Sequence, residues 1–483
     1  MLTIFRRSFF PAFMRLMRRL AKLLLSFFSY FAALFSHAVR HFTRLTSNRV
    51  RIPLPLFRRF PVPARRQPAN CQKDTYITNH HALDHIMAKL MSSSSPIALL
   101  LLLALNLPAQ IPERTKAFVE NHTVAGIVTM VLKNGKVIEF DAEGMADIEA
   151  GKPMKKDTIF QIMSMTKPFT AVGIMMLVEE GKLALRDPVE HYLPEFRDLR
   201  VVATSGPEAA KAGVPNHAIT IRDLMTHTAG IFDAPPADIK DYNQRMDIPL
   251  SELMKTFGKQ PLLFQPGTHW SYSSPGIDIL GRIIEVCSGQ KYEDFIASRL
   301  LKPLGMKDSF YFPDAAVIPR IAMVYEGHNG TLQRSPGTIL GGDPAKHREG
   351  AKYPAPAWGL YSTAEDLSHF YQMMLNGGTY EGRRYLSKFT VDLMTQIQTG
   401  DLEPSGWLGG SGYGLAWEVV KNSYGALAGH SIGTYGHGGA FGTQGWIDPK
   451  ENLITIMMIQ RSNGGTDSLR DVVMMMADTA REN

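Results

Sequence analysis

The pattern of apolar and polar residues changes at about Ile111, where regular secondary structure becomes readable. Residues 112–122 (PERTKAFVENH) read as a short helix. Residues 125–144 read as two strands on either side of Asn134-Gly135, and Asn-Gly between apolar runs is the strongest short signal for a hairpin. The middle of the chain, about residues 160–400, is mostly helical in pattern.

Strand-like runs return in the C-terminal part of the chain. The predicted strands are 412–420, 433–440, 443–448 and 452–459. Residues 448–452 (DPKEN) form a turn between the last two, and residues 466–483 form a closing amphipathic helix. Strands at both ends of a helical middle predict an α/β fold of the α+β kind. One antiparallel sheet is built from N- and C-terminal strands, is flanked by helices, and carries an inserted, mostly helical lobe.

Two apolar runs precede this region. Residues 23–39 (LLLSFFSYFAALFSHAV) are at the short end of the length that spans a membrane, and arginines flank them. Residues 96–109 (PIALLLLLALNLPA) follow a short basic start and a serine cluster. They fit a secretory signal peptide if translation begins at Met87 or Met91.

The charged residues are also unevenly distributed along the chain. The formal net charge is +7, but residues 1–86 hold 15 Lys and Arg against two acids, which leaves 37 basic and 43 acidic residues for the remainder. The mildly acidic remainder gives no case for nucleic-acid binding.

We divide the chain into a basic, hydrophobic extension (1–86), a signal-peptide-like segment (87–110) and a folded domain (111–483). The extension is interpreted as a membrane anchor, an organellar transit segment or untranslated upstream sequence. The expected location is the cell envelope, whether periplasmic, secreted or membrane-anchored.

A serine and a lysine lie three residues apart in a stretch that otherwise reads as buried helix, QIMSMTKPFTAVG (161–173). Pro168 is tolerated only in the first turn of a helix, so the helix begins close to Ser164. Lys167 then shares a face with Ser164. A serine hydroxyl needs a neighbouring base before it attacks a carbonyl, and a desolvated lysine can be neutral and act as that base.

The Ser-x-x-Lys spacing is weak evidence alone, because it occurs a second time at Ser288 and Lys291. That copy lies at the C-terminal, negative end of a helix, with Gly289 inside the motif. An activated serine would be badly placed there, whereas a helix N-terminus offers N–H donors to a developing oxyanion.

Two further stretches carry candidate chemistry. Residues 272–274 (YSS) lie in a loop before a helix, where a structural reading makes the tyrosine a packing residue and Ser273 or Ser274 the N-cap. Residues 437–439 (HGG) lie on a predicted strand, where glycines mark either a bulge or the close approach of a ligand. His227, before Gly230, is interpreted as a residue at a helix end rather than a catalytic one.

These motifs, in this order, resemble the serine β-lactamase and penicillin-binding-protein superfamily. Within it the chain is similar to the class C β-lactamase and D-alanyl-D-alanine carboxypeptidase branch, with its related esterases. Flanking stretches agree over about residues 112–483: ITIRDLMTHTAGI (219–231), FQPGTHWSYSS (264–274), LLKPLGMKDSFY (300–311), WGLYSTAEDLSHF (358–370) and GHGGAFGTQGWIDP (436–449).

The resemblance implies a role for each motif. Ser164 attacks a carbonyl and becomes acylated, while Lys167 and Tyr272 activate it and pass its proton to the leaving group. Backbone N–H groups of Ser164 and Ala440 form the oxyanion hole. Water then deacylates the enzyme, with no metal or organic cofactor. The positions implied to line the substrate site are Ser274, His437, Gly438 and Gly439.

Two departures from the family pattern bear on the substrate. Ser274 stands where an asparagine is usual, and Gly438 stands where a threonine is usual. Both losses weaken the case for an efficient β-lactamase or peptidase and are compatible with ester hydrolysis. The leading hypothesis is a serine hydrolase that cleaves an ester, amide or β-lactam bond of a small molecule or short peptide. The alternatives are a D-Ala-D-Ala carboxypeptidase or β-lactamase, and an inactive, membrane-attached binding or structural protein.

Overall fold

The computed structural model describes residues 111–202, 213–234, 246–336, 346–402, 410–422 and 429–479. All of them belong to the compact unit Ser93–Asn483. The interpretations of segments 1–86 and 87–110 lie outside the described residues. Among the helices that are described, none is both long enough and apolar enough to cross a membrane.

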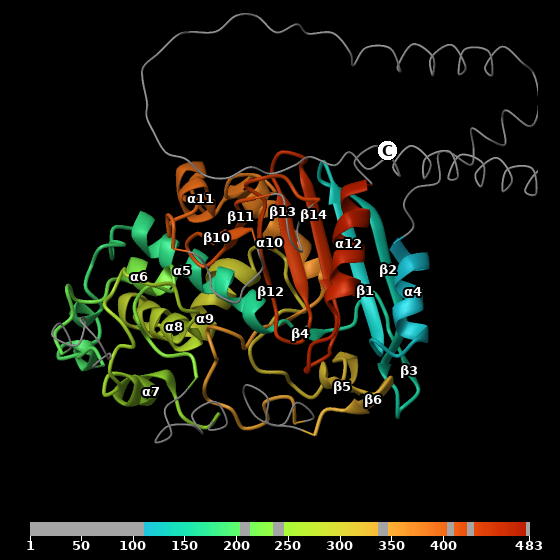
Figure 1. Ribbon diagram of the computed structural model, residues 1–483, viewed down its shortest axis with the longest axis horizontal. Coiled ribbons are helices and arrows are strands. Elements are labelled where there is room, and N and C mark those ends of the chain that lie inside the picture. Colours follow the sequence, from blue (N-terminus) through green and yellow to red (C-terminus); the bar gives the residue numbers. More distant parts are fainter. Residues whose placement is uncertain are drawn as a thin grey trace, which may run out of the picture. The chain divides into compact units, whose positions relative to one another are not determined.

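An eight-stranded antiparallel sheet joins the two ends of the domain (Figure 1). Its order is β10-β11-β12-β13-β14-β1-β2-β3. The central pair brings the N-terminal β1 beside the C-terminal β14, from Val128 opposite Met458 to Lys133 opposite Leu453. The fold predicted from the sequence is therefore confirmed. The strands are β1 Gly126–Lys133, β2 Lys136–Asp147, β3 Lys152–Pro153, β10 Ser411–Tyr413, β11 Glu418–Val420, β12 Tyr435–Gly438, β13 Gln444–Asp448 and β14 Leu453–Met458.

One predicted strand was wrong in detail. The run 412–420 is a tight hairpin of two short strands, β10 and β11, rather than a single strand. Ala416 adopts a left-handed φ of 59°, and the Gly414 N–H donates to the Trp417 carbonyl at 2.8 Å. The apolar character of the run is continuous because Leu415 and Ala416 in the turn are buried, so hydrophobicity alone does not show the reversal.

Alternate residues of β1 serve two cores. Ile127 and Val131 pack with the helices α4 (Ile111–Glu120) and α12 (Asp467–Thr479) on one face of the sheet. Val128 and Met130 face the main core, which contains α10 (Ala364–Leu375). This period of two is what an antiparallel strand buried on both faces requires.

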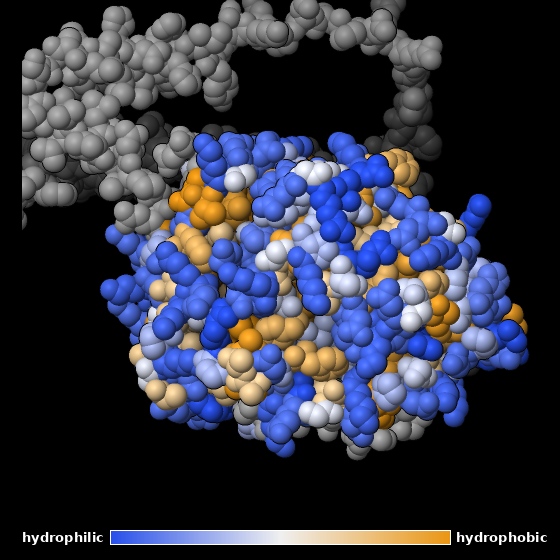
Figure 2. All heavy atoms as spheres, turned by 180° about the vertical axis from the view of Figure 1, so that it is seen from behind, coloured by the Kyte–Doolittle hydropathy of each residue, from blue (hydrophilic) through white to orange (hydrophobic). Residues whose placement is uncertain are grey.

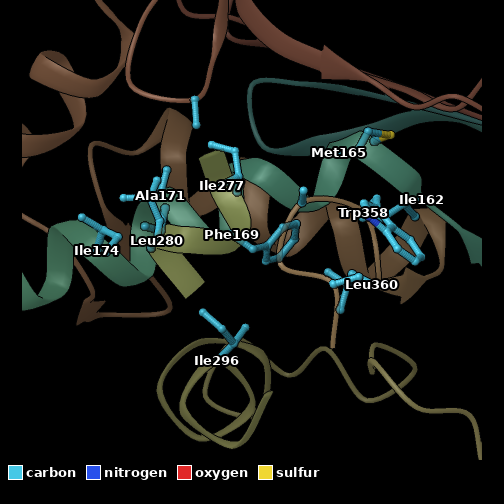
Figure 3. Close-up of a cluster of buried hydrophobic side chains, with 14 of the residues drawn as sticks. Ile162, Met165, Phe169, Ala171, Ile174, Ile277, Leu280, Ile296, Trp358 and Leu360 are labelled. Carbon is cyan, nitrogen blue, oxygen red and sulfur yellow. The ribbon is translucent and has the colours of Figure 1, made fainter. Parts of the chain in front are cut away.

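The inserted lobe is mostly helical, as expected. Figure 3 shows three of its helices, α5 (Lys167–Glu179), α8 (Ser274–Ser288) and α9 (Tyr292–Ile296). They meet through Phe169, Ile174, Ile277, Leu280 and Ile296, next to Trp358 and Leu360.

Apolar side chains on the surface shown in Figure 2 lie in small groups among hydrophilic ones, which is ordinary for a globular surface. The remaining α-helices are α5 Lys167–Glu179, α6 Ile221–Met225, α7 Leu250–Phe257, α8 Ser274–Ser288, α9 Tyr292–Ile296 and α11 Lys388–Thr395. The small sheets pair β4 Phe160–Gln161 with β7 Tyr361–Ser362, β5 Tyr325–His328 with β6 Thr331–Arg334, and β8 Thr379–Tyr380 with β9 Arg383–Arg384.

Helix α8 packs closely on the loop before β7. A Cβ at Gly281 would lie 2.2 Å from the Pro356 Cγ. We expect Gly281→Ala to lower the free energy of unfolding by about 1–3 kcal/mol, because overpacking forces neighbours off their rotamers. Urea denaturation measures the change, with Val286→Ala, an exposed position of the same helix, as control. The control should change stability by less than about 0.5 kcal/mol. A Gly281→Ala protein as stable as the wild type would contradict the close packing.

Candidate active site

Ser164 lies in a sharp turn between a strand and a helix. The strand β4 ends at Gln161, and a 3-10 turn over Met163–Thr166 leads directly into α5. Met163, immediately before the serine, is fully buried and holds a left-handed φ of 51°. A non-glycine residue adopts this conformation only when the surrounding structure imposes it. The prediction that the helix begins close to Ser164 is confirmed.

The Lys167 side chain is 0% exposed and reaches three oxygen atoms. Its Nζ lies 3.1 Å from Ser164 Oγ, 3.4 Å from Ser274 Oγ and 3.0 Å from the Ala357 carbonyl oxygen. Burial lowers the pKa of Lys167 from 10.5 to about 7, and the nearby carboxylates Asp233 and Asp278 only partly offset this effect. A substantial fraction of this amine is therefore neutral at neutral pH.

Tyr272 completes the group around the lysine. The Lys167 Nζ lies 4.5 Å from the centroid of the Tyr272 ring. Burial raises the pKa of the Tyr272 phenol, and a hydrogen bond with Ser164 partly opposes that rise.

The prediction that Ser273 or Ser274 caps a helix is also correct, because Ser273 is the N-cap of α8 and its Oγ accepts the Gly276 N–H at 3.0 Å. Ser288 lies at the other end of α8, followed by Gly289 at φ 69°, as predicted.

A fixed carboxylate supports the wall that faces the lysine. Asp278 of α8 is 0% exposed and accepts hydrogen bonds from the Ala357 N–H at 3.1 Å and from the Tyr353 hydroxyl. Burial raises the pKa of Asp278 to about 7, although both hydrogen bonds and Lys167 oppose the shift. Asp278 therefore anchors the backbone of Ala357, the residue whose carbonyl accepts from Lys167.

His437 belongs to a hydrogen-bond chain with one direction. The Ser273 N–H donates to His227 Nδ1 at 3.2 Å, so a neutral His227 carries its proton on Nε2, 3.1 Å from Tyr413 Oη. At the other end, His437 Nδ1 lies 2.7 Å from the Gly438 carbonyl, which can only accept. His437 Nε2 is then the acceptor for the Tyr413 hydroxyl at 3.2 Å. Both ends of this hydrogen-bond chain therefore give the same direction for the Tyr413 hydroxyl, which accepts from His227 Nε2 and donates to His437 Nε2.

Both histidines of this hydrogen-bond chain, His227 and His437, are electrically neutral. His437 is 0% exposed, and burial, reinforced by the charge of Lys167, lowers its pKa to about 3. Burial likewise holds the pKa of His227 well below its usual value. His437 therefore supplies no positive charge to a substrate carboxylate. His227, which the sequence left as a residue at a helix end, is part of the site wall, with its ring 4.6 Å from that of Tyr272.

The end of β12 lies against the segment that leads to Ser164. Thr443 Oγ1 donates to the Ile162 carbonyl at 3.1 Å, and a Cβ at Gly439 would lie 2.4 Å from that same oxygen. This approach brings the predicted oxyanion residue Ala440, which is exposed, to the neighbourhood of Ser164.

Sequence reasoning missed Gln444, which fills the space beside Gly438. The two residues face each other across β12 and β13, and a Cβ at Gly438 would lie 2.8 Å from Gln444 Nε2. Trp446 Nε1 donates to Gln444 Oε1 at 3.0 Å and fixes the amide. A threonine at position 438 would need Gln444 to move. The paired predicted strands could have indicated this neighbour, but not the orientation of its side chain.

Comparisons with known proteins identify the family of this chain. A model of the Beta-lactamase family matches residues 111–474. This chain belongs to the β-lactamase family. It is 34% identical to an uncharacterized protein of Mycobacterium tuberculosis over 354 residues, which are 70% of this chain and 86% of that protein. It is 28% identical to Esterase EstB of Burkholderia gladioli over 379 residues, 72% of this chain and 91% of the esterase.

A solved structure shows the same fold. EstCE1, described as a hydrolase with promiscuous acyltransferase activity, superposes with a TM-score of 0.64 at 21% identity and covers 82% of this chain and 100% of its own. The protein is a serine hydrolase of the serine β-lactamase and penicillin-binding-protein superfamily. The alternative of an inactive binding or structural protein is not favoured.

The buried amine should be dispensable for stability and essential for turnover. The fall in pKa of Lys167 from 10.5 to about 7 corresponds to roughly 5 kcal/mol at about 1.4 kcal/mol per pH unit. Lys167→Met removes this cost and leaves the Ala357 carbonyl unpaired, at about 1–3 kcal/mol. We expect turnover to fall at least a thousandfold while the melting temperature stays equal or rises. A variant that melts well below the wild type would show that Lys167 is a structural residue.

The rate should follow the neutral form of Lys167. We expect kcat/KM to rise with pH and level off, with an apparent pKa of about 7, because a protonated amine cannot accept the Ser164 proton. Initial rates between pH 5 and 9 measure the profile on a substrate with no titrating group. A kcat/KM that is still rising tenfold per pH unit at pH 9 would instead indicate a lysine with an ordinary pKa.

Proposed function

We propose that the protein is an esterase that hydrolyses small esters without a carboxylate near the scissile bond, through an acyl-serine intermediate. The observation that carries this proposal is His437, which is fully buried, neutral, and bonded through both ring nitrogens. At this position the related peptidases and β-lactamases are expected to use a group that meets a substrate carboxylate.

In the first half of the reaction, the neutral Lys167 amine takes the Ser164 proton as Oγ attacks the ester carbonyl. The new Oγ–C bond forms as the carbonyl π pair moves onto oxygen. The N–H groups of Ser164 and Ala440 are proposed to stabilise that oxyanion. When the tetrahedral intermediate collapses, the C–O bond to the alcohol breaks, and the proton passes from Lys167 through Tyr272 to the departing oxygen.

In the second half, water replaces the alcohol. It gives a proton to the Lys167 and Tyr272 pair as its oxygen attacks the acyl carbon. The proton returns to Ser164 Oγ when the acid leaves. Ser164, Lys167 and Tyr272 thus act in both halves, and the carbonyl of Ala357 holds the amine in place between them at 3.0 Å.

The alternative of a D-Ala-D-Ala carboxypeptidase or class C β-lactamase is less well supported by the side chains present. Ser274 is buried and its Oγ faces Lys167, so it does not offer the reach of an asparagine amide. Gln444 occupies the space beside Gly438 that a threonine would use. The esterase among the curated relatives is consistent with this preference. Location in the cell envelope remains a proposal from the apolar runs at 23–39 and 96–109.

A paired assay tests the esterase proposal. We expect p-nitrophenyl butyrate to be turned over with a kcat/KM at least a hundredfold above that for a chromogenic cephalosporin, which carries a carboxylate beside its β-lactam. Ser164→Ala should abolish ester turnover and covalent labelling by a fluorophosphonate probe. Ser288→Ala, which removes the second Ser-x-x-Lys serine, is the matched control and should retain both. Faster turnover of the cephalosporin than of the ester would contradict the proposal.

A further inference from the structure

An exposed carboxylate lies at the mouth of this site. Asp233 is exposed, in contrast to the buried residues Ile231 and Phe232 that precede it. Two hydrogen bonds fix this segment on the start of α8. Ser273 Oγ donates to the Phe232 carbonyl at 2.8 Å, and the Ser274 N–H donates to Asp233 Oδ1 at 2.8 Å.

These bonds place the carboxylate next to the reacting groups. Ser274, which holds Asp233 through its backbone, is the same residue whose Oγ lies 3.4 Å from Lys167 Nζ. Asp233 is the carboxylate with the largest effect on Lys167, ahead of the buried Asp278. One backbone hydrogen bond to Oδ1 leaves the negative charge of this exposed group uncompensated by a cation among its described contacts.

The charge around Ser164 is therefore unbalanced toward the negative. Among the described hydrogen-bond partners of Ser164 and Ser274, Lys167 is the side chain that can carry a positive charge, and it is neutral when it acts as the base. His437 is neutral and has both ring nitrogens occupied. A substrate carboxylate close to the scissile bond would meet a like charge, with no cationic partner among these described side chains.

We propose that Asp233 sets the charge preference of the site: it disfavours acyl groups that carry a carboxylate and favours neutral or cationic esters. Such exclusion by a like charge gives selectivity without any added attractive contact. This inference rests on the proposed esterase function and adds the acyl side of the substrate to it. Asp233 is a specificity-determining residue in this account, not a base or a nucleophile.

Three esters of similar size separate the charge effect from other effects. They are p-nitrophenyl butyrate, p-nitrophenyl hemisuccinate with an added carboxylate, and p-nitrophenyl 4-(trimethylammonio)butanoate with an added cation. Asp233→Asn removes the charge and keeps an oxygen that accepts the Ser274 N–H. Asp314→Asn is the matched control, because Asp314 is also exposed and accepts a backbone N–H, from Ala316 at 2.9 Å, away from the site.

At pH 8.5, where Lys167 is neutral in both proteins, we expect Asp233→Asn to raise the ratio of kcat/KM for hemisuccinate over butyrate about fivefold to tenfold. The ratio for the cationic ester over butyrate should fall by a similar factor. In the wild type, raising NaCl from 20 mM to 500 mM should bring both kcat/KM ratios closer to 1, because salt screens exposed charges. Asp314→Asn should leave them unchanged.

Two kinds of failure can be told apart. Equal changes for all three esters in Asp233→Asn would show a role in holding α8 alone and would overturn the inference while the esterase function stands. If the wild type hydrolyses none of the three esters, the proposed function fails and the inference falls with it. A preference of the wild type for the hemisuccinate would also overturn it.

Discussion

The structure around the active site depends on one constraint: the amine of Lys167 must be kept out of water without being paired to a carboxylate. An ion pair would return the pKa of Lys167 toward its usual range and remove the base. The amine is instead held by neutral oxygens, two hydroxyls and the Ala357 carbonyl, from three separate segments. Asp278 holds the backbone of Ala357 through its N–H, and its charge only partly opposes the fall in the pKa of Lys167.

The same desolvation determines the character of the rest of the site. His437 and His227 are buried like Lys167, and burial lowers the pKa of both rings so that they are neutral. Tyr413 joins the two rings in a chain whose direction is fixed by backbone groups at both ends. The described side chains of the site carry little positive charge, which suits the proposed neutral substrate.

Much of this could be predicted from local sequence. Asn134-Gly135 predicts the hairpin, Pro168 places the start of α5 near Ser164, and Gly289 excludes Ser288 by ending its helix. These signals work because each reflects the conformation of a few neighbouring residues. Ser164, Lys167, Tyr272 and His437 came from motifs in a characteristic order, and the structure brings them together.

The residues that sequence did not reveal act across long separations. Ala357 lies 190 positions from Lys167, and Asp233 meets α8 from 41 positions away. Their partners are set by how the loops and helices of the middle of the chain pack on one another, which no local pattern encodes. His227 follows the end of α6, as predicted, whereas its left-handed φ of 60° and its contact with Tyr413 are visible only in three dimensions.

The most direct test of the account is the protonation of Lys167 itself. Lysine labelled with ¹³C at Cε can be followed by NMR over pH 5–11, with the signal assigned by its loss in Lys167→Met. We expect one lysine signal to titrate with a midpoint near 7, well below the ordinary 10.5. Titration of that signal above pH 9 would contradict a neutral lysine base beside Ser164.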